Sequence, residues 1–133
     1  MKRRFRAIGS PTKAQKTYHD QSCALGCVVC RYRIEHCSQR VQPNENQLHH
    51  RNTGDLHGQK QIGHDAVVSM CAWHHDGVQI LGVTIEQMRE AYGPSFKHHA
   101  RDFRIWTDDA IGGRGTEAWQ RYQDELLGLK EAA

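Results

Sequence analysis

The sequence predicts a small α+β domain whose core is held by zinc and whose C-terminal part is helical. The chain has 133 residues, five cysteines and ten histidines. All five cysteines and seven of the histidines fall between residues 23 and 75, and only His19, His98 and His99 lie outside this stretch. An odd number of cysteines without a secretory leader is typical of thiolate metal ligands in a reducing compartment. Apolar residues then recur at helical spacing after residue 84.

Composition limits the class of protein further. With 38% hydrophobic and 25% charged residues in 15.2 kDa, the chain has the balance of one globular domain. Its content of Leu, Ile, Val and Phe is low, so we expect a bound metal to support the apolar core. No run approaches the roughly 18 apolar residues of a membrane span, and the N-terminus lacks the apolar segment of a signal peptide. We therefore expect a soluble cytoplasmic protein with no membrane partner.

Basic charge is concentrated at the N-terminus. The formal net charge is +3, and residues 1–16 carry only basic charges, at Lys2, Arg3, Arg4, Arg6, Lys13 and Lys16. We predict that residues 1–22 form a flexible basic arm, extended or only locally ordered, and that residues 23–133 form a single domain. Such an arm fits a polyanion, because Lys and Arg release the counterions condensed on phosphates. The alternative is a solvated, disordered terminus.

Local patterns place the elements of the first half of the domain. Residues 31–34 are compatible with a strand. The β-branched run 66–70 predicts a strand end or a buried turn that leads into a short helix at 71–75. Three glycines indicate an irregular loop over 51–64. The domain therefore divides into a core over about 27–80 and a helical part over about 84–130.

Three helices are expected in that second part. Thr84 is an N-cap with Gln87 as its capping-box partner, which predicts a helix ending at Gly93. Further helices are expected from about 95 to 106 and from about 116 to 130, on either side of a glycine-rich break.

Two groups of side chains in these regions have a simple structural interpretation. His98 and His99 are adjacent in a predicted helix, so they diverge around its axis and are expected at the surface. Trp73, Trp106 and Trp119 are expected to pack in the core rather than to stack on unpaired bases.

Two ligand pairs at the same spacing predict a structural zinc site. Cys27 and Cys30 place two thiolates on one turn, and Cys71 and His74 repeat that spacing. Together they form a Cys3His set, which suits tetrahedral zinc. The alternative is that these cysteines are small buried hydrophobic residues.

The other two cysteines are not assigned to this site. Cys23 could replace Cys27 or Cys30 as a ligand, or pack as a free thiol. Cys37 has no partner at ligand spacing, and the neighbouring His36 is expected at the surface.

Adjacent histidines near this site suggest hydrolytic chemistry. In an extended segment, His49 and His50 point to opposite sides, so one imidazole can bind a cation while the other accepts a proton from a water molecule. An imidazole suits the base because its ordinary pKa of about 6.5 leaves it mostly neutral near pH 7. His75 follows the last zinc ligand and faces away from the zinc toward the same place.

The order Cys-x2-Cys, His-His, Cys-x2-His-His resembles the HNH, or ββα-metal, endonucleases that carry a zinc knuckle. The match covers residues 27 to about 80. The segments from Gly63 through Met70 into 71–77, and the later 92–96, look like the Ref-type branch, the phage recombination-enhancement nucleases. The resemblance implies a ββα-metal core and, for a phage-encoded chain, the host-cell cytoplasm.

Carried onto this sequence, the resemblance implies a role for each histidine. His49 and His75 would be ligands of the catalytic cation, and His50 the general base. The zinc positions would fall on the four residues named above. The middle Asn of the HNH pattern should fall near Ala66, and alanine cannot replace it.

Other polar residues are candidates for the missing contact. His64, which the Ref-type resemblance includes, is preferred over Asp65 as a metal contact or an orienting group, and the alternative is a structural loop histidine. Weaker candidates are Asn52 and His57, with Asp55 and Asp76 as outer carboxylates, for which exposure to solvent is the preferred alternative.

The expected reaction is hydrolysis of a DNA phosphodiester with Mg²⁺ or Mn²⁺ as the catalytic cation and zinc as the structural ion. The basic arm would bind the DNA backbone. Local contacts could come from Arg31, Arg33, Arg51 and Lys60, for each of which a solvated surface charge is the preferred alternative. The Ref-type resemblance further implies action on DNA engaged by a recombinase filament. The alternatives are a zinc-stabilised DNA- or protein-binding module without catalysis, and a nicking nuclease of phage packaging.

Overall fold

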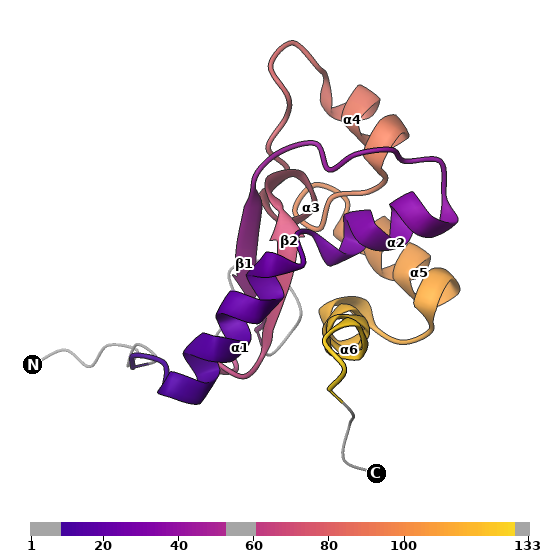
Figure 1. Ribbon diagram of the computed structural model, residues 1–133. Helices are drawn as coiled ribbons and strands as arrows, with labels where there is room; N and C mark the ends of the chain where they lie inside the picture. The colour runs from indigo at the N-terminus through magenta and orange to yellow at the C-terminus, as the bar shows by residue number, and fades with distance from the viewer. Residues whose placement is uncertain (1–8, 53–60, 130–133) are drawn as a thin grey trace, which may run out of the picture.

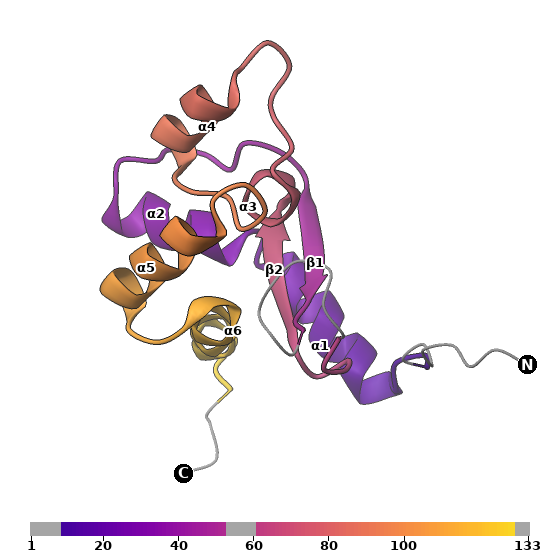
Figure 2. The same cartoon turned by 180° about the vertical axis from the view of Figure 1, so that it is seen from behind.

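The computed structural model describes residues 9–52 and 61–129, and its architecture is α+β. The elements, in chain order, are α1 (Lys13–Ala24), α2 (Val28–His36), β1 (Asn46–His50), β2 (Val67–Cys71), α3 (Ala72–Asp76), α4 (Ile85–Tyr92), α5 (Ala100–Ile111) and α6 (Gly115–Leu126). A two-stranded hairpin lies at the centre, with α1 on one side and α2, α5 and α6 on the other (Figures 1 and 2). No helix in the described ranges is long and apolar enough to cross a membrane.

The hairpin is antiparallel, and its register fixes where the histidines lie. His49 is opposite Val68, and His50 is opposite Val67. All five residues of β2 are buried, whereas β1 is mostly half-buried. Strand β2 and the start of α3 at Ala72 confirm the strand, rather than the buried turn, and the short helix expected over 66–75.

Tryptophan side chains form part of the hydrophobic core, together with residues of β2. Trp73 and Trp119 are fully buried, and their indole N–H groups donate to the carbonyl of Gly93 and to the hydroxyl of Thr107. Trp106 stacks on Trp119 with ring centroids 5.5 Å apart. The expectation that the three tryptophans pack within the fold is therefore confirmed.

Two segments form helices that the sequence analysis does not predict, because a capping residue stabilises the N-terminus of each helix. The predicted strand at 31–34 is wrong, since these residues lie inside α2, whose N-cap is Cys27. Residues 13–22 belong to α1 rather than to an extended arm, because Thr12 and Gln15 form a capping box. The arm's residues 1–8 lie outside the described ranges.

The C-terminal helices are present with shifted boundaries. The capping box of Thr84 and Gln87 is confirmed at the start of α4. Helix α5 begins at Ala100 instead of about 95, because Ser95 accepts hydrogen bonds from the backbone of the next turn and holds it outside the helix. His98 is exposed, as expected, but it lies in this turn and not in a helix.

Candidate metal centres

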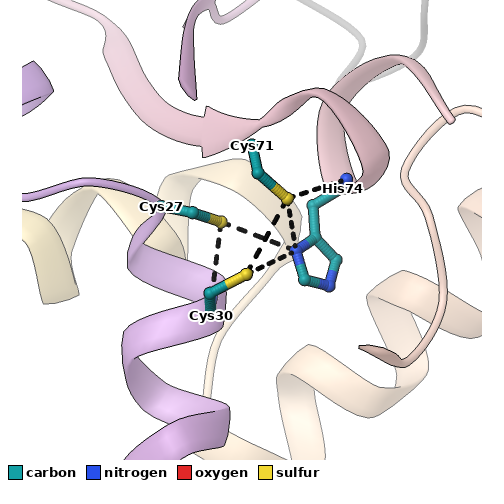
Figure 3. A group of neighbouring side chains, drawn as sticks. All are labelled: Cys27, Cys30, Cys71 and His74. Atoms are coloured by element: carbon teal, nitrogen blue, oxygen red, sulfur yellow. Dashed lines mark hydrogen bonds between the residues drawn. The ribbon is translucent and has the colours of Figure 1, made fainter. Parts of the chain in front are cut away.

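Cys27, Cys30, Cys71 and His74 form a buried cluster between β2, α2 and α3 (Figure 3). The Sγ atoms of Cys30 and Cys71 are 3.8 Å apart. The Nδ1 atom of His74 lies 3.5, 3.4 and 3.3 Å from the sulfurs of Cys27, Cys30 and Cys71. The predicted Cys3His set is thus brought together by the fold.

These spacings match the edges of a tetrahedron around zinc. With Zn–S bonds of about 2.3 Å and Zn–N bonds of about 2.1 Å, tetrahedral ligands lie about 3.8 Å apart for two sulfurs and about 3.6 Å for sulfur and nitrogen. The observed separations agree to within a few tenths of an ångström. The residues present therefore fit a structural zinc ion.

Each half of the cluster is built by a helix N-terminus. The sulfur of Cys27 accepts the backbone N–H of Cys30 at 3.3 Å, and the sulfur of Cys71 accepts that of His74 at 3.4 Å. Both cysteines are the N-caps of their helices. Helix N-termini stabilise negative charge, so both sulfurs are in positions that favour thiolates.

The imidazole of His74 is fixed by a hydrogen bond on its far side. Its Nε2 lies 2.7 Å from the carbonyl oxygen of Tyr92, which can only accept. Nε2 therefore carries the proton, and the Nδ1 lone pair faces the sulfurs. Metal-ligating histidines usually have such a backbone partner.

The pKa values of the buried cysteines shift in opposite directions. Burial raises the pKa of Cys27 well above its ordinary value. Hydrogen bonds from Cys27 and Cys30 lower the pKa of Cys71. A dication would resolve this imbalance, because it stabilises all three sulfurs as thiolates.

A second pair of histidines meets beside the first cluster. The Nδ1 atom of His49, in β1, is 3.0 Å from the Nε2 atom of His75, in α3. On its other side, Nδ1 of His75 lies 2.8 Å from Oε1 of Gln47, so it donates to that amide oxygen. His49 is 3% exposed and also packs against Phe96. The fold thus joins the two histidines predicted as ligands of a catalytic cation.

His50 points away from this pair and meets two other imidazoles. Its ring centroid is 5.7 Å from that of His19, in α1, and 5.5 Å from that of His64, in the turn before β2. One ring nitrogen of each of the three lies within 4.8 Å of the others. Burial, with smaller contributions from His19 and His64, lowers the pKa of His50. The ring is therefore neutral near pH 7.

The remaining candidates are dispersed. Cys23 and Cys37 are exposed, as are His36 and Asp65. Asp76 lies 3.8 Å from Nδ1 of His75. Asn52 is buried and pairs with Gln61, and the predicted candidates His57, Asp55 and Lys60 lie outside the described residues.

Two of the arginines considered for DNA contacts form hydrogen bonds with other side chains of the protein. Arg33 donates to Gln39 and lies over the Trp106 ring. Arg51 donates to Thr116 and Gln120 of α6. Arg31 is exposed, with one hydrogen bond to the carbonyl of Leu25.

His19 is the functional candidate that sequence reasoning missed. It was placed in a flexible arm, yet α1 carries it against the hairpin. The available signal was the Thr12-x-x-Gln15 capping box, which predicts that a helix starts at residue 13.

Comparisons of this chain with protein-family models, curated proteins and solved structures found no match.

Proposed function

We propose that the protein is a metal-dependent endonuclease that hydrolyses DNA phosphodiester bonds, with a ββα-metal core of the HNH kind. The observation that carries this proposal is the contact between His49 and His75. Two nitrogens that bind one ion at about 2.1 Å in adjacent positions of an octahedron lie about 3.0 Å apart. The separation of 3.0 Å between His49 Nδ1 and His75 Nε2 fits that value, and it is also the length of the hydrogen bond that joins the two rings and that a cation would replace.

The chemistry of the donors also fits a cation at this point. Because Nδ1 of His75 donates a hydrogen bond to Gln47, the Nε2 lone pair faces His49. Two imidazoles leave most positions of a divalent ion for water and phosphate oxygens. Mg²⁺ or Mn²⁺ bound here would supply Lewis-acid stabilisation of the charge that develops on the phosphate and the leaving oxygen.

His50 is the proposed general base. It follows His49 in β1, so the two side chains leave the strand on opposite sides. A neutral imidazole with a lowered pKa can accept the proton of a water molecule that attacks phosphorus in line. In this proposal, His49 and His75 would hold the cation that binds the phosphate, and His50 would accept the proton of the attacking water.

The position of the basic N-terminus supports a nucleic-acid substrate. The carbonyl of Gly9 accepts a hydrogen bond from Nε2 of His64, next to His50. The residues that precede Gly9 include Lys2, Arg3, Arg4 and Arg6. Gly9, the first described residue, therefore lies beside the histidines, and the basic residues before it in the sequence are of the type that neutralises backbone phosphates. By the resemblance to Ref-type nucleases, we extend the proposal to DNA engaged by a recombinase filament.

A binding module without catalysis is the second candidate. Ala66, near the place of the middle Asn, offers only its backbone, which accepts from Arg51 N at 2.8 Å. The Cys3His cluster would stabilise such a module without any chemistry. The His49–His75 contact favours the nuclease, because a zinc-stabilised scaffold has no need of a second imidazole pair.

The test is cleavage of supercoiled, linear and single-stranded DNA with Mg²⁺ or Mn²⁺, with and without a recombinase filament. His50→Ala should abolish cutting while the protein retains one zinc per chain. His36→Ala, at an exposed histidine, is the matched control and should cut normally. Equal cutting by wild type and His50→Ala would contradict the assignment of the base, and no cutting under any condition would support the binding module.

A further inference from the structure

We propose that His19, His50 and His64 form a further metal site, one for a borderline transition-metal ion such as Zn²⁺, Co²⁺ or Ni²⁺. The three ring centroids are spaced almost equally, at 5.7 Å between His19 and His50, 5.6 Å between His19 and His64, and 5.5 Å between His50 and His64. Ring nitrogens of all three lie within 4.8 Å of one another. The three side chains come from α1, the end of β1 and the turn before β2, so the tertiary fold creates the cluster.

Two of the three rings have fixed tautomers that suit ligation. Nε2 of His19 lies 2.7 Å from the carbonyl oxygen of His64, and Nε2 of His64 contacts the carbonyl oxygen of Gly9. Carbonyl oxygens only accept, so both Nε2 atoms carry protons and both Nδ1 atoms carry lone pairs. A backbone carbonyl on the far nitrogen is the usual support of a metal-binding histidine. The same arrangement holds His74 against the cysteines.

The Nδ1 atom of His64 provides independent evidence for a ligand. It is buried, and it makes no hydrogen bond with any described residue. A buried polar atom without a partner is costly and uncommon in a folded protein. A cation bound among the three imidazoles would satisfy this lone pair.

The donor set selects the type of ion. Three neutral imidazoles without a carboxylate suit borderline ions, whereas Mg²⁺ prefers oxygen ligands. Three histidines also leave one tetrahedral position open, which water or an anion can take. The site therefore differs in chemistry from the closed Cys3His cluster.

An ion at this site would affect catalysis, because His50 is also the proposed general base. The ion would occupy the lone pair that the ring needs as a base, so ion binding and proton transfer by His50 exclude each other. This consequence alone rests on the proposed function. The site itself requires only the geometry of the three imidazoles.

Titration with Co²⁺ of protein that holds one zinc per chain, in the Cys3His cluster, tests the site in the absence of DNA. We expect visible absorption typical of nitrogen and oxygen ligands, without the sulfur-to-cobalt charge transfer that replacement of zinc in the Cys3His cluster would give. His19→Gln retains a hydrogen-bonding side chain but should weaken this binding by at least about tenfold, since loss of only a supporting group already costs 10–100-fold. His64→Ala should do the same.

Two comparisons separate this site from the others. His75→Ala should retain the site, because its side chain belongs to the His49–His75 pair. His36→Ala should also bind Co²⁺ normally, and zinc content and circular dichroism should show that every variant is folded. Unchanged Co²⁺ binding in both His19→Gln and His64→Ala would overturn the proposal. Because binding is measured without DNA, a failure of the nuclease assay would contradict the proposed function and leave this site intact.

Discussion

The Nε2 atom of His74 lies 2.7 Å from the carbonyl oxygen of Tyr92, at the C-terminal end of α4. This bond joins the Cys3His cluster to a helix that contributes no ligand to it. The same helix buries Met88 in the core. Loss of the metal is therefore expected to loosen α4 as well as the two helices that begin at the cluster.

Removal of one ligand should release zinc and destabilise the whole domain. Cys71→Ser removes a thiolate that also caps α3, and structural zinc contributes on the order of 10 kcal/mol of apparent binding free energy. We expect one zinc per chain fewer than in wild type and a broad or absent thermal transition. Elemental analysis and circular dichroism measure both. Cys37→Ser, at an exposed cysteine, should match wild type, and a Cys71→Ser protein with the zinc content of wild type would contradict the ligand assignment.

Gln47 should control cation affinity at the His49–His75 pair. Its Oε1 accepts a hydrogen bond from Nδ1 of His75, and loss of such a supporting group typically costs 10–100-fold in metal affinity. Gln47→Ala should therefore weaken Mn²⁺ binding by about that factor, as measured by electron paramagnetic resonance. Gln21→Ala, at an exposed position of α1, is the control. Equal affinities in the two variants would refute the role of Gln47.

Tyr18 should link stability to alkaline pH. Its hydroxyl donates to Asp124 at 2.5 Å and accepts from Gln120 and Gln123, both at 3.0 Å. Burial, and then the bond to Asp124, raises the pKa of Tyr18 to about 12. The fold thus favours the protonated phenol, and this stabilisation is lost as pH rises above the ordinary value near 10.

Tyr18→Phe should consequently cost about 1–2 kcal/mol at pH 8, because the buried Gln123 amide loses an acceptor. The difference from wild type should narrow at pH 11, since the phenol ionises in the unfolded wild-type chain at that pH and Tyr18→Phe has no such group. Urea unfolding at the two pH values measures it. A difference that widens with pH would show that the sign of the linkage is wrong.

Gly77 should be far less replaceable than Gly82, although both have a positive φ, at 68° and 81°. A Cβ atom at Gly77 would lie 2.2 Å from the His98 ring, whereas Gly82 faces open space. Gly82→Ala should cost about 1 kcal/mol from the left-handed backbone alone. Gly77→Ala should cost roughly twice that, because His98 must also give up its hydrogen bond to the Gly77 carbonyl. Equal melting temperatures would refute the steric argument.

Short-range chemistry made part of the fold predictable. The spacing of the Cys27–Cys30 and Cys71–His74 pairs identified the four residues that the structure brings together. The Thr84–Gln87 capping box gave the start of α4, since both bonds form between residues three apart. The spacing within each ligand pair and the bonds of the capping box depend only on neighbours in the chain.

The features that escaped prediction depend on distant partners. Residues 31–34 are β-branched or aromatic in part, yet the cap at Cys27 and the packing of Tyr32 against Trp119 hold them in a helix. His19 meets His64 from 45 residues away, and no local pattern encodes that contact. That His75 faces the His49–His50 segment was expected from its place after the last zinc ligand, and the resemblance implied the pairing with His49 as ligands of one cation.

The two halves of the Cys3His cluster are separated by 41 residues between Cys30 and Cys71. At a synthesis rate of about 5–20 residues per second, Cys27 and Cys30 emerge from the ribosome roughly 2–8 seconds before their partners. During this interval the nascent chain carries an exposed vicinal dithiol that can oxidise or capture the wrong ion. The yield of native protein should therefore depend on the zinc supply and redox state of the cell during translation.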